Sequence, residues 1–399
     1  MEVGQTNGGK GRYTLCLLRN LVPQLKAHGW EITILAPKDA HLGAFGPDAR
    51  IVHLPVPKNT GIWRAVWEEV YFPVYAWGGD VYLSMNGVLP LGPLRCKRRV
   101  VVFYDIHPLQ HLADPQKYPG QYSRKSLLRT CHAMKKAARE ADQIIAISES
   151  TVQALEAFQA VPRQRMAVIP CGVEHDIFRP QSPTRIEQLR KHYRLPEDFY
   201  LFVGIPNAEP GDKKNLYLIA ETYSQAPTDE KCLLPVVIAG GERAGFRREP
   251  VEVALAGGNG RGRFWYLGFL PDEDFAALYA AARALIFPSL HEGFGIPPLE
   301  AMACGTPVIA ANRPAIPEVV GDAALLIDPT NPASLLAALR QVNDEGGRHQ
   351  LINKGLERAK GYSWERSAEL FLRLLLGAGT SMSSPAIEKI AENSHPLSS

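Results

Sequence analysis

Short apolar runs alternate with helical patterns along almost the whole chain. Residues 100–103 and 236–239 are apolar runs of strand length, and the segments after such runs repeat apolar residues at the spacing of an amphipathic helix. Strands that alternate with helices are typical of doubly wound α/β domains with parallel sheets. Because both halves of the chain show this alternation, we expect two such domains that face each other across a cleft, where the substrates would meet.

Changes in composition set the expected limits of these domains. The alternation is interrupted after residue 171, and residues 377–399 are rich in Ser and Pro. We therefore expect a first domain at 1–175, a linker at 176–195, a second domain at 196–362, a helix at 363–376 that packs back on the first domain, and a disordered tail at 377–399. A strand is expected before the glycine loop at 7–11, but only residues 1–3 could form it, so either that strand is a stub or the recorded start is late.

Residues 284–305 carry the most specific chemistry. Their apolar start, residues 284–287, predicts a buried strand that Pro288 ends. A loop with Glu292 follows, and a short helix with prolines near its start places Glu300 in its first turn. Both carboxylates then border the carboxyl edge of a parallel sheet, where ligands bind in open α/β sheets.

The same stretch can attract an anion. Free backbone N–H groups at 293–296 and the helix dipole favour a negative group, most naturally a phosphate. The residues alone leave a plainer interpretation open, in which Glu300 complements the helix dipole and Glu292 is a solvated loop residue.

A basic feature stands earlier in the second domain. After the strand expected at 199–203, Lys213 and Lys214 open a helix at 216–223. Lysines in a first helical turn oppose the dipole at a cost of about 0.3–1 kcal/mol each, which a bound anion would relieve. Screening of exposed lysines by solvent is the alternative that the residues leave open.

The first domain has candidates of its own. The strand at 100–103 runs into Asp105 and His107, and polar residues just past a buried strand are site candidates. His107 alone fits a loop histidine as well as a ligand-binding one. A long mobile loop expected at 109–126 is a further candidate, because long loops in compact domains often carry function.

Composition narrows the class of protein. The chain has 399 residues, 46% of them hydrophobic and 21% charged, and its net charge of +3 is too small to argue for nucleic acid. The 6 cysteines are scattered without a CxxC pair, which argues against a metal site or a disulfide framework and for a reducing compartment. No apolar stretch predicts a membrane span, and residues 1–12 lack the apolar core of a signal peptide. The basic cluster at 95–99 indicates a solvated strand entrance, with a phosphate or anionic-lipid contact as the alternative.

The longest motif resembles a known family. Residues 292–307, EGFGIPPLEAMACGTP, and residues 317–322, PEVVGD, resemble the donor-site signature of the retaining family 4 glycosyltransferases of the GT-B fold. Shorter resemblances occur at 8–13, 141–149, 169–173, 202–204, 213–215 and 362–365, so together they cover nearly everything from residue 8 to about residue 376. The resemblance favours a functional role for the two glutamates.

The resemblance also implies roles for individual residues. Glu300 would hold the ribose hydroxyls of a nucleotide sugar, Glu292 the hydroxyls of the transferred sugar, and Lys214 the leaving diphosphate. Lys214 and Glu292 are thus the expected catalytic residues. The expected donor contacts are Lys213, Asn215, Gly240, Gly241, Gly293, Phe294, Gly295, Ile296 and Glu300, and the expected acceptor side comprises Gly8, Gly9, Lys10, Asp105 and His107.

The family further implies a reaction that needs no metal and no cofactor. Cleavage of the sugar–phosphate bond through an oxocarbenium-like state puts negative charge on the diphosphate, which fixed cations and helix amino ends can stabilise. The acceptor hydroxyl is expected to attack from the front side, and the departing phosphate oxygen to take its proton.

Three departures from the family pattern stand out. Ile205 occupies a usually basic position, which leaves the diphosphate to the two lysines. Tyr104 stands before Asp105 where the family commonly has histidine, so His107 would substitute. The nearly absent first strand would fit an incomplete chain with weak activity.

We predict a cytoplasmic hexosyltransferase. Peripheral attachment at the inner face of the membrane is an alternative location. The enzyme would move mannose, from GDP-mannose in preference to a UDP-hexose, to a saccharide or lipid-linked saccharide, and bind no nucleic acid. The preference for mannose rests on the general resemblance of residues 63–71 and 104–119 to mannosyltransferases. The alternative is a non-catalytic sugar-nucleotide-binding subunit that partners an active transferase, and a phosphorylase or epimerase ranks last because neither signature is apparent.

Overall fold

The computed structural model describes residues 9–37, 42, 45–54, 72–116, 118, 120, 122–204, 210–227, 229–241 and 264–377. The chain forms two compact units. Unit 1 runs up to Gly172 and resumes at Trp364, and unit 2 runs from Val173 to Ser363. The chain therefore leaves unit 1 once and returns to it with its last described helix.

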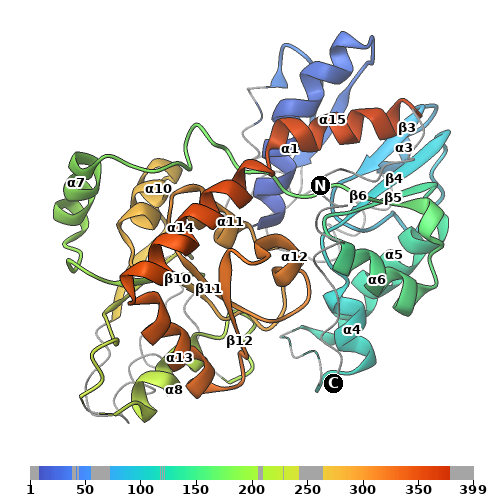
Figure 1. Ribbon diagram of the computed structural model, residues 1–399. Coiled ribbons are helices and arrows are strands. Elements are labelled where there is room, and N and C mark those ends of the chain that lie inside the picture. Colours follow the sequence, from blue (N-terminus) through green and yellow to red (C-terminus); the bar gives the residue numbers. More distant parts are fainter. Residues whose placement is uncertain are drawn as a thin grey trace. The chain divides into compact units, whose positions relative to one another are not determined.

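Unit 2 is built on a six-stranded parallel sheet (Figure 1). The strands are β7 (Tyr200–Val203), β8 (Val236–Ala239), β9 (Phe264–Gly268), β10 (Ala284–Phe287), β11 (Val308–Ala311) and β12 (Ala324–Ile327), in the order β12-β11-β10-β7-β8-β9. The four central strands are apolar and buried along almost their whole length. Such strands need helices on both faces of the sheet.

The winding of the chain places helices on opposite faces of this sheet. β8 follows β7 on one side, and β11 follows β10 on the other, so right-handed crossovers put α8 (Leu216–Gln225) and α11 (Ile296–Ala303) on opposite faces. α8 packs with α13 (Pro332–Val342), and α11 packs with α10 (Asp272–Ala281) and α14 (Glu345–Lys360). The remaining helices of unit 2 are α7 (Pro183–Tyr193) and α12 (Ile316–Val320).

The direction of winding reverses between β7 and β10, which lie side by side. At such a switch point the connections leave to opposite sides and open a crevice at the carboxyl ends of the two strands. The segments that begin at Gly204 and Pro288 start from these ends. The topology of unit 2 therefore indicates this crevice as the candidate ligand site.

Unit 1 contains a four-stranded parallel sheet and a separate pair of parallel strands (Figure 1). The sheet has the order β3 (Val81–Ser84), β4 (Arg98–Phe103), β5 (Gln143–Ala146) and β6 (Met166–Val168), and β1 (Thr33–Pro37) pairs with β2 (Arg50–Leu54). Its helices are α1 (Gly9–Ala27), α3 (Phe72–Tyr75), α4 (His107–Ala113), α5 (Arg124–Glu140), α6 (Glu149–Gln159) and α15 (Trp364–Leu375), with a short 3-10 helix, Arg163–Arg165.

α15 is held to unit 1 at both of its ends. Trp364 is 2% exposed, and its ring meets the ring of Tyr13 in α1 edge-on, with centroids 5.5 Å apart. At the other end, the Arg98 guanidinium donates to the carbonyl oxygens of Leu374 (3.1 Å) and Leu375 (3.0 Å). The last carbonyls of a helix have no partner inside it. The Gly377 backbone N–H also donates to the Leu374 carbonyl, at 3.3 Å, so Arg98 and Gly377 together cap the end of α15.

Two segments expected as loops contain helices. The range 176–195, expected as a linker, contains α7, whose Arg185 and Tyr193 both bind the Asp274 carboxylate of α10. The loop expected at 109–126 is shorter, because α4 begins at His107 with Pro108 in its first turn, and the Ser123 hydroxyl caps α5. Proline in a first turn and a serine cap favour helix where composition alone suggested loop.

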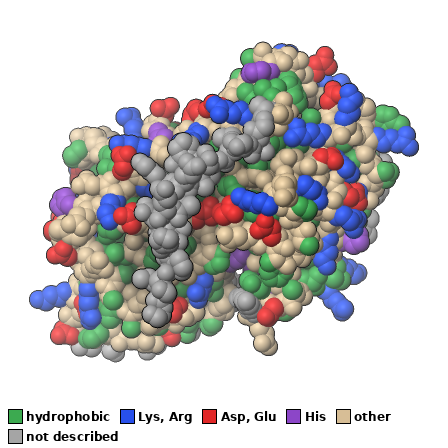
Figure 2. Space-filling view, turned by 45° about the vertical axis from the view of Figure 1, so that its right-hand side comes forward, with side chains coloured by type: hydrophobic (Ala, Val, Ile, Leu, Met, Phe, Trp, Pro, Cys, Tyr) green, Lys and Arg blue, Asp and Glu red, His purple; other side chains and the backbone are tan. Residues whose placement is uncertain are grey.

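Several expectations concern residues outside the described ranges: the strand at 1–3, the aromatic region at 63–71 and the tail from residue 378. Among the described helices, none is both long and apolar enough to cross a membrane. On the face shown in Figure 2, basic and acidic side chains are interspersed, in keeping with the net charge of +3.

Replacing Trp364 with alanine should destabilise unit 1 by about 3–5 kcal/mol, because a large buried side chain would leave a cavity against α1. Trp77→Ala is the matched control, since Trp77 is 63% exposed and its loss should cost less than about 1 kcal/mol. Urea denaturation followed by circular dichroism measures both free energies of unfolding. Equal losses would contradict the docking of α15 on α1.

Candidate active site

The segments after β7 and β10 are tied together at the switch point. The backbone N–H of Leu290 donates to the carbonyl oxygen of Lys213 at 2.9 Å. The side-chain amide of Asn215 donates to the carbonyl oxygens of Pro288 (3.1 Å) and Pro329 (2.8 Å). Asn215 is thus a positioning residue, and its expected contact with a donor stays a prediction.

α8 begins later than the sequence suggested. Asn215 has a left-handed backbone, with φ of +58°, and the helix starts at Leu216. Asparagine tolerates this conformation better than most residues. Lys213 and Lys214 therefore lie in the turn before the helix, not in its first turn, and the proposed cost of opposing its dipole does not apply as stated.

Lys214 and Glu292 form an ion pair at this point. The Lys214 Nζ donates to Glu292 Oε1 at 2.7 Å, and the Lys213 Nζ lies 3.9 Å from Glu292 Oε2. The Lys214 Nζ also lies 5.0 Å from the ring centroid of Phe287, the last residue of β10, within cation–π range. Because only 13% of the Glu292 side chain is exposed, the lysines rather than solvent hold its charge.

The ion pair sets the protonation state of Glu292. Burial would raise its pKa, but the charges of Lys214 and then Lys213, with the hydrogen bond from Lys214, outweigh burial and lower the pKa to about 2. The carboxylate is therefore charged at neutral pH. It can accept hydrogen bonds there but has no proton to donate.

Gly295 precedes α11 in a conformation that suits glycine alone. Its φ of +121° lies in the region that side chains rarely adopt. A Cβ there would lie 2.9 Å from Ile316 Cδ1, closer than packing allows. This position therefore depends on the absence of a side chain.

The start of α11 offers backbone donors to a ligand. Within the described part of the chain, the N–H groups of Phe294, Gly295 and Ile296 have no acceptor, and no side chain caps the helix. Pro297 and Pro298 carry no N–H. The three amides beside Glu292 are thus the donors that the helix start presents, and an anion is their natural acceptor.

Glu300 is buried inside α11. The sequence placed Glu300 in the first turn of the helix. The helix already starts at Ile296, so Glu300 lies beyond that turn. Its side chain is 5% exposed, and Oε2 accepts a hydrogen bond of 3.1 Å from the Tyr279 hydroxyl of α10. α10 therefore fixes the orientation of this carboxylate.

Two further donor-site candidates, Gly240 and Gly241, directly follow β8. Gly240 has a φ of +113°, and a Cβ there would lie 3.3 Å from the Gly204 backbone nitrogen. Gly241 also has a positive φ, +77°. These glycines let the end of β8 approach the end of β7, while the contacts of Gly240, Gly241 and Gly293 with a donor stay predictions. Ile205 lies outside the described residues.

The candidates of unit 1 include the start of α1. Gly9 is the first residue of that helix, and the Lys10 Nζ lies 5.6 Å from the ring centroid of Tyr104. Tyr104, which replaces the expected histidine, is buried and donates to the Met85 carbonyl at 2.7 Å. Gly8 lies outside the described residues.

His107 begins α4, and Asp105 lies two residues before it. An Asp105 carboxylate oxygen accepts from the His107 backbone N–H at 3.0 Å, and His107 Nδ1 lies 2.7 Å from the Tyr122 hydroxyl. His107 is 6% exposed. The Lys10 Nζ lies over the ring of Tyr104, and Asp105 is the next residue in the chain. Lys10 and Asp105 therefore both lie close to Tyr104.

One acidic pair has the Asp-x-Asp spacing of a metal motif, Asp272 and Asp274 at the start of α10. Asp274 is bound to Arg185 and Tyr193, which accounts for its place in the fold. Among the described residues, no three His, Cys, Asp or Glu side chains are grouped as around a metal ion.

Known families and relatives match both units. Residues 17–177 match the family described as Glycosyltransferase Family 4, and residues 182–358 match Glycosyl transferases group 1. O-antigen chain mannosyltransferase B of Escherichia coli is 31% identical over 278 residues, which are 68% of each chain. Serotype-specific mannosyltransferase WbdA of Escherichia coli is 31% identical over 285 residues, 70% of this chain but 34% of WbdA, so the chain spans about a third of that relative.

Solved structures share the architecture over nearly the whole chain. Sucrose-phosphate synthase from Thermosynechococcus elongatus has a TM-score of 0.69 at 22% identity, covering 95% of this chain and 96% of that one. WaaG, a glycosyltransferase involved in lipopolysaccharide biosynthesis, has a TM-score of 0.69 at 16% identity, covering 93% and 96%. At these identities the likeness shows the fold alone.

Two doubly wound units with parallel sheets, like those of these solved structures, give the chain the GT-B fold. The family matches and the 31% identical relative place it further: the chain belongs to the group 1, or family 4, glycosyltransferases. It is thus an enzyme of the hexosyltransferase class.

Sequence reasoning missed two residues of the site, Tyr279 and Phe287. Phe287 ends a predicted strand, so its place at the carboxyl edge of the sheet was open to inference. The contact of Tyr279 with Glu300 depends on how α10 packs on α11, which no local pattern reveals.

Lys214→Ala should raise the pKa of Glu292 above about 2, because burial is then opposed chiefly by the more distant Lys213. A carboxyl whose pKa is lowered in the folded state stabilises the fold. This stabilisation is complete at pH values above the usual carboxyl pKa of about 4.5, and it is lost as pH falls through about 2. The variant should therefore be least stable relative to the parent above about pH 5, and the gap should narrow towards pH 2.

Urea denaturation across this pH range measures the gap. Lys360→Ala is the control, since Lys360 is 70% exposed and pairs with an exposed glutamate, Glu357. A gap for Lys214→Ala that does not change with pH would contradict the assignment.

Proposed function

We propose that the switch point of unit 2 is the donor site of a retaining hexosyltransferase that uses a nucleotide sugar. The observation that carries this proposal is the Lys214–Glu292 ion pair of 2.7 Å beside the open amides of Phe294, Gly295 and Ile296. The Lys214 ammonium and the N–H donors can bind a diphosphate, and the Glu292 carboxylate can accept hydrogen bonds from sugar hydroxyls.

A bound donor would change the partners of this ion pair. Glu292 neutralises Lys214 while no phosphate is present, which keeps a partly buried ammonium compensated. A diphosphate would take over Lys214 as its partner and draw on the amides at the start of α11. Glu292, released from its closest lysine, would then accept hydrogen bonds from the hydroxyls of the sugar.

Glu300 is proposed to hold the ribose hydroxyls. A buried carboxylate fixed through the Tyr279 hydroxyl is already oriented, so little side-chain freedom is lost when a ribose binds. Glu300 would bind the nucleotide, and Glu292 the sugar, at opposite ends of the diphosphate.

The transfer itself needs charge stabilisation at the leaving group. As the sugar–phosphate bond breaks, negative charge grows on the diphosphate, and Lys214 with the three amides would stabilise it without reorganisation. The acceptor hydroxyl attacks from the same face, and its proton passes to the departing phosphate oxygen. Glu292, with a pKa of about 2, serves as an acceptor of hydrogen bonds in this step rather than as an acid.

The names of two relatives support mannose as the sugar, and we propose GDP as its nucleotide carrier. O-antigen chain mannosyltransferase B and WbdA are both named for mannose, at 31% identity. HepE of Anabaena, with a TM-score of 0.69 at 16% identity, was solved with UDP and glucose, so the fold alone accommodates another donor. We infer an acceptor that is a saccharide or lipid-linked saccharide, received by unit 1 near Lys10, Asp105 and His107, in the cytoplasm or at the inner membrane face.

GDP should raise the melting temperature of the protein more than UDP, and Glu300→Ala should abolish the rise, because the ribose loses its carboxylate. Differential scanning fluorimetry measures both. Tyr279→Phe should reduce the rise less, since it removes only the group that orients Glu300. An unchanged rise in Glu300→Ala would remove its assigned role, and no rise with either nucleotide would overturn donor binding.

With GDP-mannose and a lipid-linked saccharide acceptor, Lys214→Ala should lower kcat by about 10²–10³-fold, the usual cost of losing one group that stabilises transition-state charge. Lys360→Ala is the matched control, because Lys360 is 70% exposed and its ion pair with Glu357 involves no residue of the candidate site. Nucleotide binding without turnover on any acceptor would instead favour the non-catalytic subunit.

A further inference from the structure

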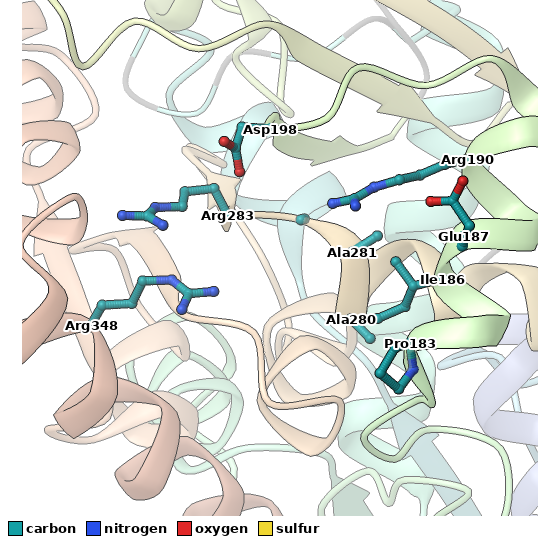
Figure 3. A pocket seen from close by; sticks show the side chains of 10 residues that line it. Pro183, Ile186, Glu187, Arg190, Asp198, Ala280, Ala281, Arg283 and Arg348 are labelled. Carbon is teal, nitrogen blue, oxygen red and sulfur yellow. The ribbon is translucent and has the colours of Figure 1, made fainter.

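A pocket opens at the other end of the strands of unit 2, away from the candidate donor site (Figure 3). It has a volume of about 480 Å³ and lies at the amino ends of β7 and β10, since Asp198 stands just before β7 and Arg283 just before β10. Ala280 and Ala281 form part of an apolar wall. The candidate donor site lies at the carboxyl ends of the same two strands, so the two sites are separated by the length of the strands.

Three arginines from three different elements line this pocket. Arg190 comes from α7, Arg283 from the turn before β10 and Arg348 from the first turn of α14. In Figure 3, Arg190 and Arg348 approach the pocket from opposite walls. Three cations held in a shared cavity repel one another unless a negative group lies between them.

Two of these guanidinium groups have unused donors. The Nε atoms of Arg190 and Arg348 are buried and find no acceptor among the residues that the structure describes. A buried donor left without an acceptor costs about 1–3 kcal/mol, more where the group is charged. A ligand that brings acceptor oxygens into the pocket would recover this cost.

The acidic side chains around the pocket do not supply these acceptors. Arg283 donates to Glu345 at 2.5 Å, and Glu187 pairs with Lys191 at 3.3 Å. Asp198 also lines the pocket, but neither buried Nε donates to it. Burial, and after it the charge of Arg283, lowers the pKa of Arg348, although the charges of Glu345 and Asp198 act in the opposite direction.

We propose that this pocket binds a phosphate group, either as inorganic phosphate or as part of a small organic monophosphate. Guanidinium forks match the oxygens of a phosphate, and a tetrahedral anion can accept from arginines that arrive from several directions. A planar carboxylate suits one arginine better than three. The volume falls in the range of small-ligand sites, roughly 300–1,000 Å³, and leaves room along the alanine wall for an organic body.

Calorimetric titration of the full chain with inorganic phosphate and with glucose 6-phosphate, at constant ionic strength, tests the proposal. Arg348→Gln and Arg190→Gln should each weaken binding of the tighter ligand at least about tenfold, because each removes one charge-assisted contact. Tighter binding of glucose 6-phosphate would identify an organic monophosphate, and equal binding would identify phosphate alone.

Two matched variants separate this site from the donor site. Arg340→Gln removes an arginine of the same unit that pairs with Glu230 outside the pocket, and it should leave binding unchanged. Lys214→Ala should also leave it unchanged. The proposal is overturned if neither ligand binds, if Lys214→Ala abolishes the binding, or if folded Arg348→Gln and Arg190→Gln both bind as the parent does.

Discussion

The ion pair between Lys214 and Glu292 is the interaction around which unit 2 is arranged. It joins the segments that leave β7 and β10, the two strands between which the winding of the sheet reverses. Neither charge would be stable alone in this partly buried place, so each requires the other until a ligand replaces one of them. The pair therefore joins the two segments at the switch point. In the proposed function it also keeps both groups charged for binding a donor.

The supporting contacts explain why the ion pair lies where a diphosphate would bind. Asn215 and the Leu290 amide fix the two segments to each other, and Gly295 lets the chain turn into α11 without a side chain in the way. α11 then presents its open amides beside Glu292 and carries Glu300 to Tyr279. Arginines line a pocket at the amino ends of β7 and β10, so the two phosphate sites that we propose lie at opposite ends of these strands.

The sequence was most informative where chemistry and local rules coincide. The alternating strands and helices, and the motif from Glu292 to Glu300, were sufficient to predict two doubly wound units and the family. Helix starts were less predictable, because they depend on single conformations such as the left-handed backbone of Asn215. The Tyr279 contact and the Lys214–Glu292 pair join residues far apart in the chain, which only the packed sheet brings together.

A crystal structure of the chain with GDP bound tests the central claim most directly. The account predicts diphosphate oxygens within hydrogen-bond distance of the Lys214 Nζ and the amides of Phe294 to Ile296, with the 2.7 Å contact between Lys214 and Glu292 broken or lengthened. A bound diphosphate that leaves this contact unchanged, or that lies away from the start of α11, would contradict it.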